Sequence, residues 1–192
     1  VDMGESALHK VEVPASWLTA EDAPSAEKKA VPEFIEKVVV PMNRQEGDKL
    51  PVSTFVGIED GTFPSGTAAY EKRGVASYVP HWDVTKCIQC NQCSFICPHS
   101  TIRPVLLNEA EEKAAPAGFE TKPALGKELA GLKFRMQVSP LDCLGCGNCA
   151  DICPAKALTM VPLEEELKEA EAWEYAVNEV EQKDLMSRST VK

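Results

Sequence analysis

Two short runs hold all eight cysteines of this 192-residue chain. The first run begins at Cys87 and the second at Cys143, and each reads Cys-x2-Cys-x2-Cys-x3-Cys-Pro. Cysteine thiolates at this spacing ligate [4Fe–4S] clusters, whose chemistry is the storage and transfer of single electrons. The first chemistry that the sequence predicts is therefore iron–sulfur redox chemistry.

The spacing also predicts which cysteines share a cluster. Three thiolates two residues apart can wrap one compact cluster in a tight loop, whereas the fourth is carried away by the next short helix and ligates the other cluster. We therefore expect two [4Fe–4S] clusters. The expected ligands are Cys87, Cys90, Cys93 and Cys153 for the first cluster, and Cys143, Cys146, Cys149 and Cys97 for the second.

Zinc and disulfides are the alternative uses of these cysteines. Structural zinc sites usually combine two Cys-x2-4-Cys pairs across a longer span, which four cysteines crowded before Pro98 fit poorly. Eight cysteines in 192 residues lie well below the density of a disulfide scaffold, and no secretory signal peptide is visible. Both alternatives are weaker than iron–sulfur ligation.

Extended segments are expected on both sides of each run. Residues 79–86 lead into the first run and 100–105 lead out, while 134–142 and 157–161 do the same for the second. This repeat predicts an α+β fold, a bacterial 2[4Fe–4S] ferredoxin-like core with a pseudo-twofold axis. Apolar residues matched between the repeats are expected to form a dry shell around the clusters; the pairs are Ile88 with Leu144, Ile96 with Ile152, and Ile102 with Leu158.

Three regions are expected along the chain. Residues 1–78 form a long, turn-rich N-terminal arm with a short helix over Phe34–Val40, ending before Pro41, and a strand over 52–58. Residues 79–161 form the cluster core, with a solvated loop inserted at 107–133. Residues 162–192 form a C-terminal amphipathic helix and tail, with Pro162 at the helix start. Its apolar face is expected to contain Leu163, Leu167, Ala170, Trp173, Val177 and Val180.

The charge of the chain restricts its partners. A formal net charge of −10 disfavours nucleic acid and anionic membrane surfaces, and no apolar run is long enough to span a bilayer. Cysteines used as metal ligands suggest a reducing, cytoplasmic setting. The exception to the acidic character is a basic strip expected to attract acidic electron carriers; it contains Lys122, Lys127, Lys133 and Arg135.

Three stretches together resemble the pyruvate:ferredoxin (2-oxoacid:acceptor) oxidoreductases, and specifically their ferredoxin-like domain with two [4Fe–4S] clusters. They are the run Gly57–Gly74, the two cysteine repeats, and Trp173-Glu174-Tyr175-Ala176. The resemblance implies that electrons come from a thiamine diphosphate site that oxidises pyruvate with coenzyme A. It also implies an external ferredoxin or flavodoxin as acceptor.

The chain lacks the catalytic features of that family. Thiamine diphosphate and Mg²⁺ binding there uses a Gly-Asp-Gly start with a downstream Asn, and neither Gly47-Asp48-Lys49 nor Glu59-Asp60-Gly61 qualifies. We therefore expect no catalytic residues here. Thiamine diphosphate, Mg²⁺ and coenzyme A are expected only in catalytic domains or subunits of a parent pyruvate synthase, from which this chain, starting at Val1, is an excised piece or a subunit.

Two other kinds of role are compatible with the cysteine repeats. The chain could be a free-standing ferredoxin-type carrier or the iron–sulfur subunit of another redox complex, or its clusters could be purely structural.

The second cysteine loop has Gly145 and Gly147 where the first has Gln89 and Asn91. Because glycine lets backbone amides approach cluster sulfurs, and such contacts raise potential, we expect the Cys143 centre to have the higher potential.

Overall fold

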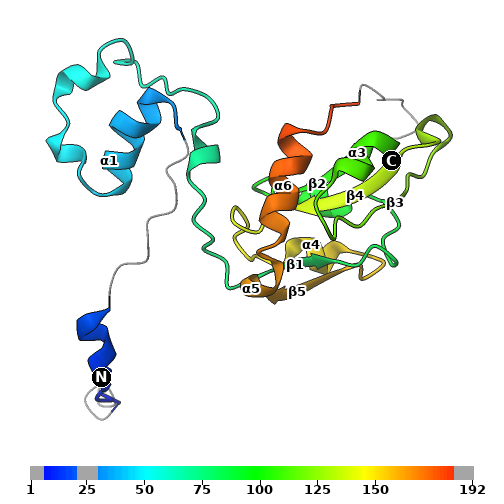
Figure 1. Ribbon diagram of the computed structural model, residues 1–192, viewed down its shortest axis with the longest axis horizontal. Coiled ribbons are helices and arrows are strands. Elements are labelled where there is room, and N and C mark those ends of the chain that lie inside the picture. The colour runs from blue at the N-terminus through cyan, green and yellow to red at the C-terminus, as the bar shows by residue number, and fades with distance from the viewer. Residues whose placement is uncertain (1–6, 21–29, 184–192) are drawn as a thin grey trace. The chain divides into compact units, whose positions relative to one another are not determined.

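The strands that flank the two cysteine runs pair crosswise in the computed structural model (Figure 1). Strand β1 (Tyr78–Trp82), before the first run, is antiparallel to β5 (Leu158–Pro162), after the second. Strand β2 (Ile102–Leu107), after the first run, is antiparallel to β4 (Lys133–Val138), before the second. Each repeat therefore depends on the other for its strand partners.

A short helix follows each cysteine loop, α2 (Gln92–Ile96) in the first repeat and α4 (Asn148–Ile152) in the second. The expected order of strand, loop, helix and strand is confirmed in both repeats. The pseudo-twofold axis itself stays a prediction.

The structure describes residues 7–20 and 30–183, which belong to two compact units, Val1–Tyr70 and Glu71–Lys192. All eight cysteines lie in the second unit. Among the helices of the described ranges, none combines the length and the apolar character that crossing a bilayer requires.

Apolar side chains from both repeats form one core beside the cysteines. Its buried members are Trp82, Cys93, Ile102, Phe134, Met136, Val138, Cys149 and Leu158. The expected dry shell is present only in part. The strand pair Ile102 and Leu158 is buried, whereas the loop pair Ile88 and Leu144 is 54% and 51% exposed.

The insertion at 107–133 is more ordered than the solvated loop that we expected. It contains α3 (Glu109–Ala114), the 3-10 helix η6 (Lys127–Leu129) and β3 (Lys122–Pro123), which pairs with β4. Helix α3 begins with a capping box, in which the Asn108 side chain accepts from the Glu111 N–H and the Glu111 carboxylate accepts from the Asn108 N–H. Such a box satisfies two backbone donors that would otherwise lack partners.

The C-terminal segment forms two short helices instead of one. Helix α5 (Leu163–Glu166) starts after Pro162, as expected, and α6 (Glu169–Asn178) follows. The predicted apolar face is right only in part. Trp173 is buried as expected, but α6 also buries Ala172 and Ala176, while Leu167 and Val177 are about half exposed.

Polar contacts accompany this burial pattern. Glu166 turns inward to His81 Nδ1 at 2.9 Å, and Glu169 turns inward to the Arg135 guanidinium. Residues 184–192 of the predicted tail lie outside the described residues.

The first unit consists of short helices. A π-helix (η2, Ile35–Val39) runs into α1 (Val40–Asn43), with Ile35 and Val38 buried. The predicted helix is thus confirmed, but it continues through Pro41, which stands at the start of α1, where a missing N–H costs little. The remaining 3-10 helices are η1 (Ala15–Thr19), η3 (Gly47–Lys49), η4 (Val52–Phe55) and η5 (Thr67–Tyr70).

The strand expected over 52–58 is wrong. Val52 begins η4, and Val52 and Val56 are both exposed, so this apolar pattern faces solvent instead of a sheet. A turn follows at Asp60, whose Oδ1 accepts a hydrogen bond from the Thr62 N–H at 2.9 Å. Phe34 packs edge-on against Phe63 within the same unit, with ring centroids 5.2 Å apart.

Candidate metal centres

The two cysteine loops have the same backbone conformation. Each contains two left-handed residues at matching positions, Gln89 and Asn91 in the first loop (φ 58° for both) and Gly145 and Gly147 in the second (φ 69° and 78°). Left-handed residues reverse the chain sharply, so three successive cysteines can turn toward one side. The side chains at these positions differ, but the shape of the loop does not.

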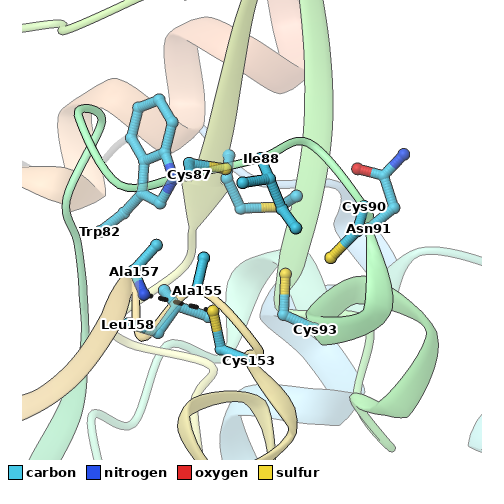
Figure 2. A pocket seen from close by; sticks show the side chains of 11 residues that line it. Trp82, Cys87, Ile88, Cys90, Asn91, Cys93, Cys153, Ala155, Ala157 and Leu158 are labelled. Carbon is cyan, nitrogen blue, oxygen red and sulfur yellow. Dashed lines mark hydrogen bonds between the residues drawn. The ribbon is translucent and has the colours of Figure 1, made fainter.

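Four cysteines surround the first cavity. Cys87, Cys90 and Cys93 come from the first loop and the start of α2, and Cys153 comes from the end of α4. Figure 2 shows the sulfurs of Cys90, Cys93 and Cys153 pointing into the same space, with Trp82 along one side. The spacing of the sequence groups the same four cysteines.

The other four cysteines surround a second cavity. Cys143, Cys146 and Cys149 come from the second loop and α4, and Cys97 follows α2. This set too is the one that the spacing groups together. Cys146 is the only cysteine of the eight whose residue is exposed to solvent.

Backbone N–H groups donate to sulfur at equivalent places in both sets. The Gln89 N–H lies 3.5 Å from Cys87 Sγ, and the Gly145 N–H lies 3.4 Å from Cys143 Sγ. For the cysteine that comes from the other repeat, the N–H four residues later is the donor. Its N···Sγ distance is 3.4 Å from Thr101 to Cys97 and 3.2 Å from Ala157 to Cys153.

The buried thiols are poor acids unless a metal binds them. Burial raises the pKa of Cys93 to about 12 and that of Cys149 to about 11. Burial also raises the pKa of Cys97, but hydrogen bonds from Thr101 and from the backbone N–H groups of His99 and Ile102 together outweigh it, so this pKa lies below the ordinary value of a thiol. Because a metal deprotonates a coordinating thiol outright, ligation would convert these thiols to thiolates.

The donor sets fit iron–sulfur clusters. All eight cysteines are free thiols, and they surround two cavities instead of converging on one point. Among the residues that the structure describes, no three His, Cys, Asp or Glu side chains form a group that could hold a single metal ion. A cluster with several iron atoms needs its thiolates spread around a volume.

An unsatisfied donor beside the first cavity also fits an anionic cluster. The Trp82 side chain lines this cavity, and its Nε1–H is buried without a hydrogen-bond partner in the structure. Buried donors without a partner are rare and need an explanation. Cluster sulfur is an acceptor that would provide one.

Comparison with known proteins agrees with this geometry. Residues 86–157 match a family described as a 4Fe-4S dicluster domain, and residues 20–76 match EKR, a domain of unknown function. Over its whole length the chain is 57% identical to a pyruvate-flavodoxin oxidoreductase of Enterobacter agglomerans and 55% identical to a pyruvate:ferredoxin oxidoreductase of Moorella thermoacetica. The chain is therefore similar over its whole length to one part of these pyruvate oxidoreductases. The resemblance expected from the sequence is therefore confirmed.

The chain spans only a small part of these relatives. It covers 16% of the length of each of the two oxidoreductases named above. A pyruvate dehydrogenase [NADP(+)] of Euglena gracilis is 44% identical over 79% of the chain, which covers 8% of that relative. The chain therefore corresponds to one iron–sulfur segment of much larger oxidoreductases.

The basic strip expected to attract acidic carriers is not continuous at the surface. Lys127 is exposed, whereas Arg135, on β4, is only 3% exposed. Its guanidinium donates to the carboxylate of Glu169 and to Gln137 Oε1. Lys133 forms an ion pair with Glu112 at 3.4 Å. Charge along a sequence gives the sign of a segment but does not give the side of the sheet on which each residue falls.

Two residues that hold the first cysteine loop were missed in the sequence. Lys122 Nζ donates to the carbonyl oxygens of Val84 and Cys87, both at 2.7 Å. The Gln89 side chain donates to the Pro123 carbonyl at 2.8 Å and accepts from the Leu125 N–H at 2.9 Å. No local pattern marks these contacts, because their partners lie more than thirty residues away in the chain.

Proposed function

We propose that this segment holds two [4Fe–4S] clusters and relays single electrons. The first cluster would be held by Cys87, Cys90, Cys93 and Cys153, and the second by Cys143, Cys146, Cys149 and Cys97. The observation that carries the proposal is that four cysteines line each of two cavities, and that each set draws on both repeats. Clusters bound in this way supply reversible one-electron chemistry.

The residues of the chain would bind, shield and connect the two centres. Cys93 and Cys149 lie in one buried hydrophobic cluster, and α2 and α4, which carry them, are in contact with each other. Electrons would therefore pass between the centres through a water-poor region. Backbone N–H groups near Cys87, Cys97, Cys143 and Cys153 would stabilise negative charge on the ligand sulfurs.

The rest of the pathway would lie outside this segment. The names of the relatives indicate pyruvate as the electron source and ferredoxin or flavodoxin as the acceptor. We propose that electrons arrive from a thiamine diphosphate site, with Mg²⁺ and coenzyme A, in catalytic domains or subunits of the parent cytoplasmic enzyme. Residues 1–78 and 162–192 would dock on these catalytic parts, and residues 79–161 would carry the clusters.

Reconstitution of the chain without oxygen tests this proposal. The loaded chain should contain about eight iron atoms, accept electrons from dithionite and pass them to ferredoxin or flavodoxin. Pyruvate with thiamine diphosphate, Mg²⁺ and coenzyme A should not reduce it, because decarboxylation needs a carbanion sink. Adding the catalytic part of the relative should restore reduction by pyruvate. Acetyl-CoA formation by the 192-residue chain alone, or an iron content of about one per cysteine set, would contradict the proposal.

A further inference from the structure

The two cysteines that reach across from the other repeat have different hydrogen-bond partners. Cys97 and Cys153 each accept the backbone N–H of the residue four positions later. Among the described residues, Cys97 also has a hydroxyl partner, that of Thr101, with Oγ1 at 3.4 Å from Sγ. The residue in the matching position of the other repeat is Ala157, which has no hydroxyl.

The Thr101 hydroxyl is held in this position by its surroundings. Thr101 is 5% exposed, and its carbonyl accepts the Ser139 N–H at 2.7 Å, which fixes the backbone. Cys97 Sγ is the hydrogen-bond partner that the structure gives for this hydroxyl among the described residues. A buried hydroxyl with one partner has little freedom to turn elsewhere.

Ligation decides the direction of this hydrogen bond. A free Cys97 thiol could donate to the hydroxyl or accept from it, whereas a ligating thiolate has no proton to donate. With a cluster bound, the Thr101 hydroxyl must therefore donate and Cys97 Sγ must accept. The second centre then receives one O–H···S hydrogen bond that the first centre lacks.

We propose that Thr101 sets the reduction potential of the centre at Cys97, Cys143, Cys146 and Cys149. This inference rests on the proposed function. Reduction adds one electron to a cluster whose negative charge spreads onto its thiolates, so a donor to one thiolate stabilises the reduced state more than the oxidised state. The burial of Thr101 strengthens the effect, because a hydrogen bond is electrostatically stronger in a low-dielectric environment.

Substitutions at the two matched positions test the proposal. Thr101→Val keeps the shape of the side chain and removes the hydroxyl, while Thr101→Ser keeps a hydroxyl. Ala157→Ser adds a hydroxyl at the matching position of the other repeat. The reconstituted full chain would be titrated with dithionite, which donates one electron to each centre, and followed by EPR.

Thr101→Val should lower one midpoint potential and leave the other unchanged. We expect a threefold to tenfold change in the distribution of an electron between the centres, and a tenfold change corresponds to about 59 mV. Thr101→Ser should retain the wild-type value, and Ala157→Ser should raise the midpoint that Thr101→Val leaves unchanged. Resonance Raman bands of one centre should also lose part of their sensitivity to H/D exchange in Thr101→Val.

Failure of the inference differs from failure of the proposed function. A wild-type chain that takes up no clusters would refute both. Full iron content with unchanged midpoints in Thr101→Val would refute the inference alone, and so would a shift of equal size in Thr101→Ser. If Thr101→Val does not load, Thr101→Ala removes the same hydroxyl from a smaller side chain, and unchanged midpoints in that variant would be equally decisive.

Discussion

The first cysteine loop and the second have the same backbone but different supports. Their left-handed positions coincide, and the N–H···Sγ distances at Cys87 and Cys143 are 3.5 and 3.4 Å. Matched helix residues also have matching exposure, 43% for Ile96 and 42% for Ile152. The cysteine spacing is therefore accompanied by one backbone conformation, whereas the residues that pack around each loop differ.

Side chains support the first loop, whereas backbone contact supports the second. Gln89 and Lys122 join the first loop to the insertion through hydrogen bonds. At the matching position of the second loop, Gly145 lies so close to β1 that a Cβ would be 2.8 Å from the Tyr78 carbonyl oxygen. Glutamine and glycine thus occupy equivalent left-handed positions for different reasons. Perturbing one support should affect one centre more than the other.

The largest expected effect comes from removing a cysteine that reaches across. Cys153→Ala should damage the centre built on Cys87, Cys90 and Cys93, although Cys153 belongs to the second run, because its sulfur lies in the first cavity. Cys97→Ala should damage the other centre. EPR and iron content of the reconstituted variants measure the loss. Selective loss of the Cys143 centre in Cys153→Ala would show that each run binds its own cluster.

The next effect is expected at Gly145. Gly145→Ala combines a left-handed strain of about 1–2 kcal/mol with a clash at Tyr78 O, which adds about 1–3 kcal/mol. Gly131→Ala is the matched control, because Gly131 also has positive φ (87°) but a Cβ there meets nothing within 4 Å.

Thermal denaturation and cluster retention distinguish these two variants. Gly145→Ala should unfold at a lower temperature than Gly131→Ala and release iron from the Cys143 centre first. Equal melting temperatures, with equal iron retention, would mean that the second loop can move away from β1 without cost.

Lys122 gives the complementary test on the first loop. Lys122→Met removes two hydrogen bonds from a charged donor to carbonyl oxygens, which should lower the free energy of unfolding by about 1–3 kcal/mol. Loss of the first cluster should become faster while loss of the second is little changed. The control is Lys127→Met, since Lys127 is exposed on η6. Chelator-induced bleaching of each EPR signal measures both rates, and equal rates in the two variants would contradict the support assigned to Lys122.

Local sequence was sufficient for the strands and short helices that flank the two cysteine runs, and for the grouping of the cysteines. Spacing determines how far a cysteine can lie from its neighbours, and the helix after each third cysteine carries the fourth to the other cavity. Helix α3 could also have been predicted from local sequence, because Asn108 followed three residues later by Glu111 is a capping-box signature.

Contacts between distant segments could not be predicted in this way. Glu169 on α6 contacts Arg135, 34 residues away in sequence. Apolar periodicity takes no account of polar side-chain contacts such as those of Glu166 and Glu169. The burial of Arg135 has the same origin, because its partners Glu120 and Glu169 lie in other segments of the chain.

The smallest expected effect concerns Trp82, which distinguishes the first centre as Thr101 distinguishes the second. Trp82 lines the first cavity, with a buried Nε1–H that has no partner in the structure, and the matching residue of the second repeat is Val138, which has no donor. Trp82→Phe should keep the apolar contact with Phe134, whose ring centroid lies 6.4 Å away, and remove the N–H.

If the indole donates to cluster sulfur, Trp82→Phe should lower the midpoint potential of the first centre. The shift should be a few-fold change in electron distribution, and it should affect the midpoint that Thr101→Val leaves unchanged. Trp173→Phe is the control, because Trp173 is also buried but lines neither cysteine cavity. If Trp82→Phe and Thr101→Val shifted the same midpoint potential in a redox titration, both donors would act on one centre. That result would contradict the assignment of Trp82 to the first centre and Thr101 to the second.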